Sequence, residues 1–155
     1  MFRYEKTSLI KNCTLEDLYE FHLDSNNLVK ITPPDMKVTM LNDSFEAKED
    51  EILRLKTEKK FMPIPIYWEV KILKNQKPNL LVDFAMKSPF RYWKHSHIFT
   101  KRGNSVELKD EVLYVLPFGK IGKLFNFFVE RELEKMFNYR HKVTKEILSQ
   151  QNNIN

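Results

Sequence analysis

Two histidines and one aspartate occupy positions where the sequence pattern calls for apolar side chains. His95 and His97 lie in the 93–99 run, which begins with tryptophan and ends with phenylalanine, and Asp110 lies in the apolar 108–116 run. Side chains alternate between the two faces of a strand, so each run has one largely apolar face, and these three polar groups lie on it. Buried polar groups without partners cost about 1–3 kcal/mol each. The sequence therefore predicts a polar cluster that faces the protein interior.

This cluster admits three chemical interpretations. If the chain turns near Gly103, Asp110 comes beside His95 or His97 across a hairpin. The first interpretation, which we favour, is a network in which the carboxylate accepts hydrogen bonds from the imidazoles. The second is the polar end of a ligand cavity or an acid–base pair, with His95, His97 and Asp110 as candidate catalytic residues. The third is a metal triangle, but a zinc or iron site usually needs a fourth ligand, and we expect no metal and no cofactor.

The elements around the cluster alternate between extended and helical patterns. A strand over 2–10 precedes a helix whose first turn carries Thr14 as N-cap and Asp17 three residues later. A second short helix follows, capped by Asp24 or Ser25. Six further strands are expected over 36–41, 51–57, 66–72, 80–87, 92–99 and 106–116. Short turns join these strands, which favours an antiparallel meander.

The chain ends in a long amphipathic helix. Apolar residues recur every three or four positions between 121 and 147, except for a wider gap around Arg140. A helix of about 25–28 residues is about 40 Å long, so its apolar stripe must lie against the sheet, and we expect Phe125 and Phe128 to face the space between them. The prediction is an α+β fold in which a curved antiparallel sheet of about six or seven strands wraps around this helix. We expect one domain over 1–150 and a polar tail over 151–155.

Several segments, in this order, are similar to one known family. They are FHLD at 21–24, NL at 27–28, ITPP at 31–34, VDF at 82–84, PFRYWKHSHIF at 89–99 and DEVLYVLPFG at 110–119. Together with the order of elements, they resemble the START-like superfamily of helix-grip proteins, which includes birch-pollen-allergen proteins, lipid-transfer START domains and polyketide cyclases. The segments look closer still to a bacterial SRPBCC branch often labelled cell-division-inhibitor-like. The superfamily mixes carriers, sensors and enzymes, so the resemblance implies a ligand cavity but no reaction.

The resemblance implies that a small apolar or amphipathic molecule, such as a lipid or a polyketide-like compound, binds between the sheet and the last helix. The residues expected to contact it are Trp68, Phe84, Trp93, His95, His97, Phe99, Asp110, Val112, Tyr114, Phe125 and Phe128. Those expected at the cavity mouth are Phe61, Met62, Phe90 and Phe118. Prolines make the 61–66 segment a predicted bend or loop, either a lid or a packed connection.

Two alternative functions stay open beside ligand binding. One is a cyclase- or dehydratase-type enzyme that uses a His–Asp pair in a water-poor cavity. The other is a regulatory module that binds another protein. The sequence leaves the choice open, because the same polar cluster serves the fold, a ligand or a proton transfer.

Composition argues against several further classes. Cys13 is the only cysteine, which excludes an internal disulfide framework and thiolate-rich metal sites. The net charge of +5 comes from scattered lysines rather than a basic stripe, so no nucleic-acid partner is expected. No apolar run approaches the roughly 20 residues that span a bilayer, and the first residues lack a signal-peptide pattern. We therefore expect a cytoplasmic protein without integral membrane association, as a monomer or a homodimer.

Overall fold

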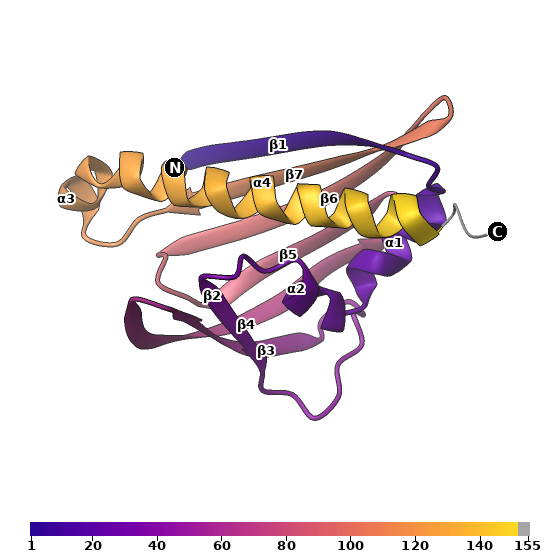
Figure 1. Cartoon of the computed structure of the whole chain (residues 1–155). Coiled ribbons are helices and arrows are strands. Elements are labelled where there is room, and N and C mark those ends of the chain that lie inside the picture. Colours follow the sequence, from indigo (N-terminus) through magenta and orange to yellow (C-terminus); the bar gives the residue numbers. More distant parts are fainter. Residues whose placement is uncertain (152–155) are drawn as a thin grey trace.

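Seven antiparallel strands form one curled sheet in the order β1-β7-β6-β5-β4-β3-β2 (Figure 1). The computed structural model describes residues 1–151, without the side chains of residues 62, 63 and 151. The strands are β1 (Phe2–Lys11), β2 (Met36–Met40), β3 (Ile52–Lys59), β4 (Met62–Gln76), β5 (Leu80–Lys87), β6 (Tyr92–Arg102) and β7 (Ser105–Val115). The helices are α1 (Leu15–Leu23), α2 (Asn26–Lys30), α3 (Gly119–Leu124) and α4 (Asn126–Gln151). The predicted α+β class and strand number are confirmed, whereas the predicted tail lies, from residue 152 on, outside the described residues.

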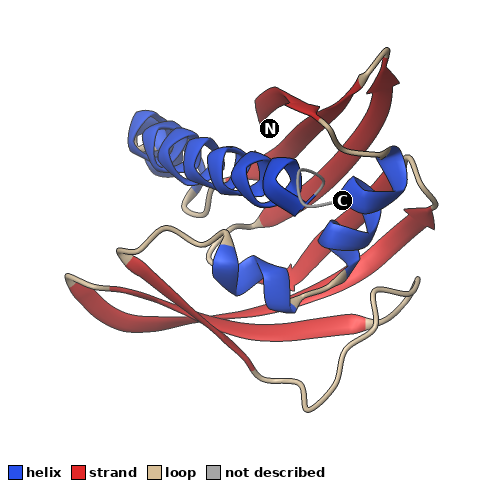
Figure 2. Cartoon of the chain, turned by 45° about the vertical axis from the view of Figure 1, so that its right-hand side comes forward, coloured by secondary structure: helices blue, strands red, loops and turns tan. Residues whose placement is uncertain are grey.

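The long helix α4 runs along one side of the curled sheet, with α1 and α2 on the same side (Figure 2). One core cluster holds Leu133 and Phe137 of α4 against Tyr114 of β7. A second cluster holds Leu148, near the end of α4, with Leu18 of α1. The helix is thus attached to the sheet at both of its halves. Within residues 1–151, no helix has both the length and the apolar character that crossing a membrane requires.

The predicted start signals of the first two helices are present. In α1, the Asp17 amide donates to the Thr14 hydroxyl and the Thr14 amide donates to the Asp17 carboxylate, each at 3.0 Å. These bonds form the capping box that the sequence predicts. At α2, the Ser25 side chain makes no cap bond, but the Asp24 carboxylate accepts the Asn26 amide at 2.9 Å.

The predicted long helix is present as α4, whose 26 residues match the expected length. It begins later than the apolar pattern suggests, because the helical conformation is interrupted at Phe125, the C-cap residue of the short helix α3. Before this break, Phe118 and Gly119 have left-handed backbones with φ of 64° and 56°. These two residues turn the chain out of β7, and α3 extends beyond the end of the sheet (Figure 1).

The 61–66 segment corrects one prediction. Phe61 lies in a tight turn, and residues 62–66 form the first part of β4 instead of a bend or loop. The segment pairs only with β3, because β5 pairs with β4 from Glu69 onward. The β3–β4 register also shifts between Thr57 and Lys59. Pro63 and Pro65 are tolerated here because a strand edge beside a register shift has few ladder bonds to lose.

The β6–β7 hairpin turns at Gly103 and Asn104, and Gly103 has the positive φ of 58° that such short turns favour. The register places Asp110 directly opposite His97. The prediction that Asp110 lies beside one of the two histidines is therefore confirmed.

Candidate functional site

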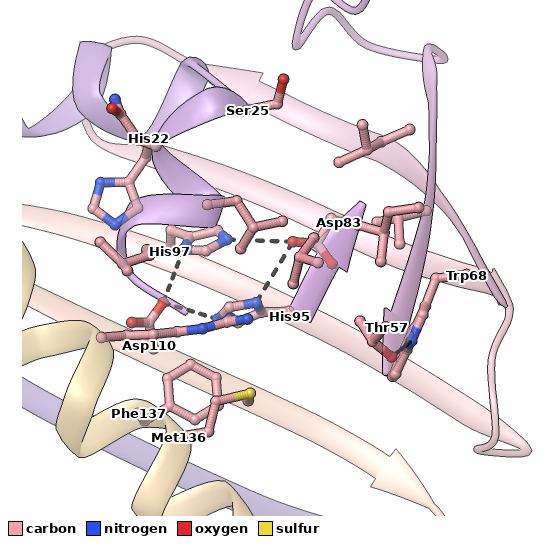
Figure 3. A pocket seen from close by; sticks show the side chains of 18 of the residues that line it. His22, Ser25, Thr57, Trp68, Asp83, His95, His97, Asp110, Met136 and Phe137 are labelled. Atoms are coloured by element: carbon pink, nitrogen blue, oxygen red, sulfur yellow. Dashed lines mark hydrogen bonds and ion pairs between the residues drawn. The ribbon is translucent and has the colours of Figure 1, made fainter. Parts of the chain in front are cut away.

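A cavity of about 380 Å³ lies between the sheet and α4. Its apolar walls include Val38, Leu53, Leu55, Trp68, Val70 and Met136. One end of the cavity is polar and is formed by His22, Asp83, His95, His97, Asp110, Arg140 and His141. Figure 3 shows His95, His97 and Asp110 of this end close together, on the side of the pocket away from Trp68. We call these seven residues the polar end.

The strand register positions the central groups of the polar end. Asp83 of β5 lies opposite His95 of β6, and Asp110 of β7 lies opposite His97 of β6. His95 and His97 are two positions apart on one strand, so both rings point into the cavity. Their ring centroids are 3.9 Å apart. Three neighbouring strands therefore place two carboxylates and two imidazoles together.

Asp110 is the most buried carboxylate of the polar end, with only 3% of its surface exposed. His95 Nε2 donates to Asp110 Oδ1 at 2.8 Å, and His141 Nε2 donates to Asp110 Oδ2 at 2.7 Å. His97 Nδ1 also lies 2.8 Å from Asp110 Oδ1, but the contact lacks the direction of a hydrogen bond. The second nitrogen of His141 lies 2.9 Å from the hydroxyl of Ser8. One buried carboxylate thus contacts three imidazoles.

Asp83 is the second carboxylate of the polar end, and its contacts are longer. Its Oδ2 atom lies 3.3 Å from His97 Nε2 and 3.6 Å from His95 Nδ1. His95 and His97 therefore each have one ring nitrogen toward Asp110 and the other toward Asp83 (Figure 3).

The surroundings raise the pKa of one histidine of the polar end and lower the pKa of two others. Burial favours a neutral His97, but the charge of the adjacent Asp110 and the charge and hydrogen bond of Asp83 outweigh burial and raise the pKa of His97 to about 9. Burial and the neighbouring His97 lower the pKa of His95, and the same causes lower the pKa of His22 to about 3. Burial favours a neutral Asp110, but the charge of His97 and the imidazole hydrogen bonds hold its pKa well below the usual range. Near neutral pH an imidazolium at His97 therefore lies beside the Asp110 carboxylate.

Arg140 brings a guanidinium to the polar end from α4. Its Nε atom is buried, and Arg140 forms no hydrogen bond or ion pair with any residue that the structure describes. Its guanidinium carbon lies 5.6 Å from the centroid of the Phe137 ring, a distance at which a cation interacts with the ring face. Burial lowers the pKa of Arg140, and the nearby Asp110 and Asp83 oppose this effect.

Comparisons with known proteins place this geometry in a known architecture. No family model matches the sequence, and no curated protein matches it. A solved structure from Chromobacterium violaceum has a TM-score of 0.75 at 7% identity and covers 95% of this chain and 96% of that chain. A Thermus thermophilus protein has a TM-score of 0.72 at 14% identity and covers 94% of this chain and 95% of that chain. A START superfamily protein from Mycobacterium smegmatis has a TM-score of 0.69 at 13% identity and covers 96% of this chain and 98% of that chain.

The chain has the START-like fold. At these identities the likeness concerns the fold alone, so the cell-division-inhibitor-like branch stays a prediction. The helix-grip arrangement expected from the sequence is confirmed, because α4 lies against the curled sheet as it does in this fold.

The START-like fold brings together six of the residues predicted for the cavity and its mouth. They are Trp68, Phe90, Trp93, His95, His97 and Asp110, all of which line the cavity. Phe99, Val112 and Tyr114 are fully buried in the core clusters instead of lining the cavity. Phe84 lies on the opposite face of β5 from Asp83, and its ring centroid is 5.4 Å from that of Tyr92. The catalytic role proposed for the His–Asp groups stays a prediction.

Four other predicted residues lie on the surface. Phe125 and Phe128, expected to face the space between helix and sheet, are 55% and 62% exposed. The break at Phe125 ends the helical periodicity from which their direction was predicted, and α3 lies beyond the sheet. Phe61 and Phe118, expected at the mouth, are 89% and 83% exposed and lie outside the cavity lining. The side chain of Met62 lies outside the described residues.

Four residues of the polar end were not predicted for the site from the sequence. Asp83 lies two positions after Leu81 on β5, so the two share a face, and the inward direction of Asp83 could have been found from the same period of two that identified His95. Arg140 and His141 lie where the apolar stripe of the last helix has its wider gap. Polar residues that interrupt an apolar stripe are a signal for a buried polar contact. His22 gave a weaker signal, because helical spacing alone placed it on the apolar face of α1.

Proposed function

We propose that this protein binds one small amphipathic molecule in the cavity between the sheet and α4. The observation that carries the proposal is the division of the cavity into apolar walls and one polar end. A volume of about 380 Å³ falls within the roughly 300–1,000 Å³ of small-molecule pockets. The ligand's apolar part would lie along β3 and β4, and its polar group would lie at the polar end.

The energetics of the two cavity regions support this orientation. Leu53, Leu55 and Val70 offer apolar surface, and burying apolar ligand area stabilises a complex by about 25 cal/mol per Å². A purely apolar ligand would leave Arg140 and Asp83 without compensation for lost water. A polar group at that end therefore favours an amphipathic molecule over a hydrocarbon. A lipid or a polyketide-like compound has the chemistry required.

Two ion pairs mark the rim through which the ligand would pass. Lys59 at the end of β3 pairs with Glu132 of α4, and Asp35 before β2 pairs with Lys135 of α4 at 2.6 Å. All four residues line the cavity, and their side chains are 36–59% exposed. These pairs connect α4 to the β2–β3 side of the sheet, so they would have to open or bend aside for exchange.

Native mass spectrometry of the gently purified protein tests the proposal. The expected spectrum contains a second species heavier than the chain by one small molecule, and solvent extraction should release that molecule with an apolar portion and a polar group. A fluorescent apolar probe, Nile red, should then bind the extracted protein with a stoichiometry of one. Absence of both a co-purified molecule and saturable probe binding would refute the proposal.

A further inference from the structure

Three potential ligand atoms converge on the cavity side of β5 and β6. Asp83 Oδ2, His95 Nδ1 and His97 Nε2 all lie within 4.8 Å of one another. Asp83 Oδ2 is 3.3 Å from His97 Nε2 and 3.6 Å from His95 Nδ1. All three residues line the cavity. We call them the Asp83 triad.

The spacing within the triad is compatible with coordination of one ion. Charge-assisted hydrogen bonds are about 2.7–2.9 Å long, as are those of Asp110 with His95 and His141 at 2.7–2.8 Å, whereas the hydrogen bond between His97 Nε2 and Asp83 Oδ2 is longer, at 3.3 Å. In a tetrahedral site, bonds of about 2.0–2.2 Å to one ion separate neighbouring ligand atoms by about 3.3–3.6 Å. The distances of 3.3 and 3.6 Å from Asp83 Oδ2 to the two imidazole nitrogens match this separation. We propose that Asp83, His95 and His97 bind a divalent first-row transition ion.

Asp110 supplies the outer contacts that such a site requires. Imidazoles that bind a metal through one nitrogen usually present the other to a carboxylate or carbonyl. His95 Nε2 and His97 Nδ1 both lie 2.8 Å from Asp110 Oδ1, which leaves His95 Nδ1 and His97 Nε2 directed toward Asp83. His141 holds the other oxygen of Asp110. The His95 ring is thus oriented by its hydrogen bond to Asp110, and the His97 ring by its hydrogen bond to Asp83.

The charges around the triad also favour a cation. Asp83 and Asp110 bring two carboxyl groups to the polar end, against the single guanidinium of Arg140.

Two nitrogens and one carboxylate oxygen form a donor set typical of zinc, cobalt or iron. Three protein ligands leave one or more coordination positions open. Because the triad lines the cavity, those positions would face the bound molecule and could accept water or a ligand oxygen. The site goes beyond the proposed function, since an ion can bind whether or not an amphipathic molecule does.

Titration with Co²⁺ alone tests the inference, because Co²⁺ bound by nitrogen and oxygen ligands absorbs visible light. We expect one ion per chain by calorimetry and by the cobalt absorption. Asp83→Asn should weaken binding by at least about a hundredfold, more than the 10- to 100-fold typical of outer-contact changes. Glu111→Gln is the matched control, because Glu111 pairs with Arg3 outside the cavity. The affinity of this variant for Co²⁺ should equal that of the unaltered chain.

Imidazole nitrogen NMR of the unaltered chain with Zn²⁺ gives a second measurement that does not depend on a variant. Direct coordination should shift His95 Nδ1 and His97 Nε2 more than either nitrogen of His141. Absence of binding at millimolar Co²⁺, equal losses in Asp83→Asn and Glu111→Gln, or shifts centred on His141 would each overturn the proposal. Nile red binding is measured in the same samples, so failure of the ion site is distinguished from failure of the cavity.

Discussion

Asp110 of β7 and His141 of α4 are joined by a hydrogen bond of 2.7 Å between Oδ2 and Nε2. This bond crosses from the sheet to the helix at the polar end of the cavity. Because His141 also contacts Ser8 of β1 at 2.9 Å, one imidazole links α4 to two neighbouring strands. The polar end therefore stabilises the closed arrangement of helix and sheet as well as lining the cavity.

We expect Asp110→Asn to destabilise the protein by about 3 kcal/mol, because it leaves buried imidazoles without their shared charge. Urea unfolding followed by circular dichroism measures the loss. Glu111→Gln, one residue away on the outer face, breaks an exposed pair with Arg3 and should cost no more than about 1 kcal/mol. Equal losses in the two variants would argue against the central role of Asp110.

Filling the cavity should abolish probe binding. Leu55 is buried and lines the cavity, whereas Arg54 is its exposed neighbour on β3. We expect Leu55→Trp to reduce Nile red affinity at least about tenfold, because overpacked volume removes space for the probe. Arg54→Trp adds the same ring on the outer face and should leave fluorescence titrations unchanged. Retained affinity in Leu55→Trp would place the binding site elsewhere.

Replacing the exposed phenylalanines on either side of the first residue of α4 should not change binding in the cavity. Phe125→Ala and Phe128→Ala change residues that are 55% and 62% exposed, so we expect stability changes within about 0.5 kcal/mol. Nile red titration should give the affinity of the unaltered chain. A clear loss of affinity would instead support the inward placement expected from the sequence.

Breaking the rim pairs should speed ligand exchange. The double variant Asp35→Asn with Glu132→Gln removes both pairs between α4 and the β2–β3 side. Exposed pairs contribute about 0.2–1 kcal/mol each, so we expect the loss of two pairs to accelerate Nile red release in stopped flow about two- to thirtyfold. Glu107→Gln breaks the Arg102 pair outside the cavity lining and serves as the control. Unchanged release in the double variant would mean that exchange uses another route.

Cys13 should react slowly with thiol reagents at moderate pH. Burial, together with the charge of Asp17, raises the pKa of the Cys13 thiol to about 11. A pKa this far above the ordinary thiol value lowers the thiolate fraction near pH 8 about a hundredfold, and the thiolate is the reactive form. Iodoacetamide labelling should therefore rise about tenfold per pH unit between pH 8 and 10. The unfolded chain is the control, and equal rates for folded and unfolded chains at pH 8 would contradict the burial.

Local patterns were sufficient to predict most of the framework. The Thr14–Asp17 capping box follows from residues three apart in the chain, and the placement of Asp110 beside His97 follows from the turn at Gly103. Such features depend on neighbours in sequence or on one hairpin, so period and spacing determine them. The proline-rich start of β4 was mispredicted because strand pairing, not local composition, decides whether prolines can be tolerated.

The sequence by itself determined the order of the elements, the inward direction of His95 and His97, and the presence of a long helix. Only the tertiary structure decided that Asp83, Arg140 and His141 join the histidines, because a periodic pattern gives the face of one element but not the element that it meets. The left-handed backbone at Phe118 likewise moved α3 off the sheet. A backbone turn of this kind changes the direction of the side chains that follow it. The spacing of apolar residues does not predict such a turn.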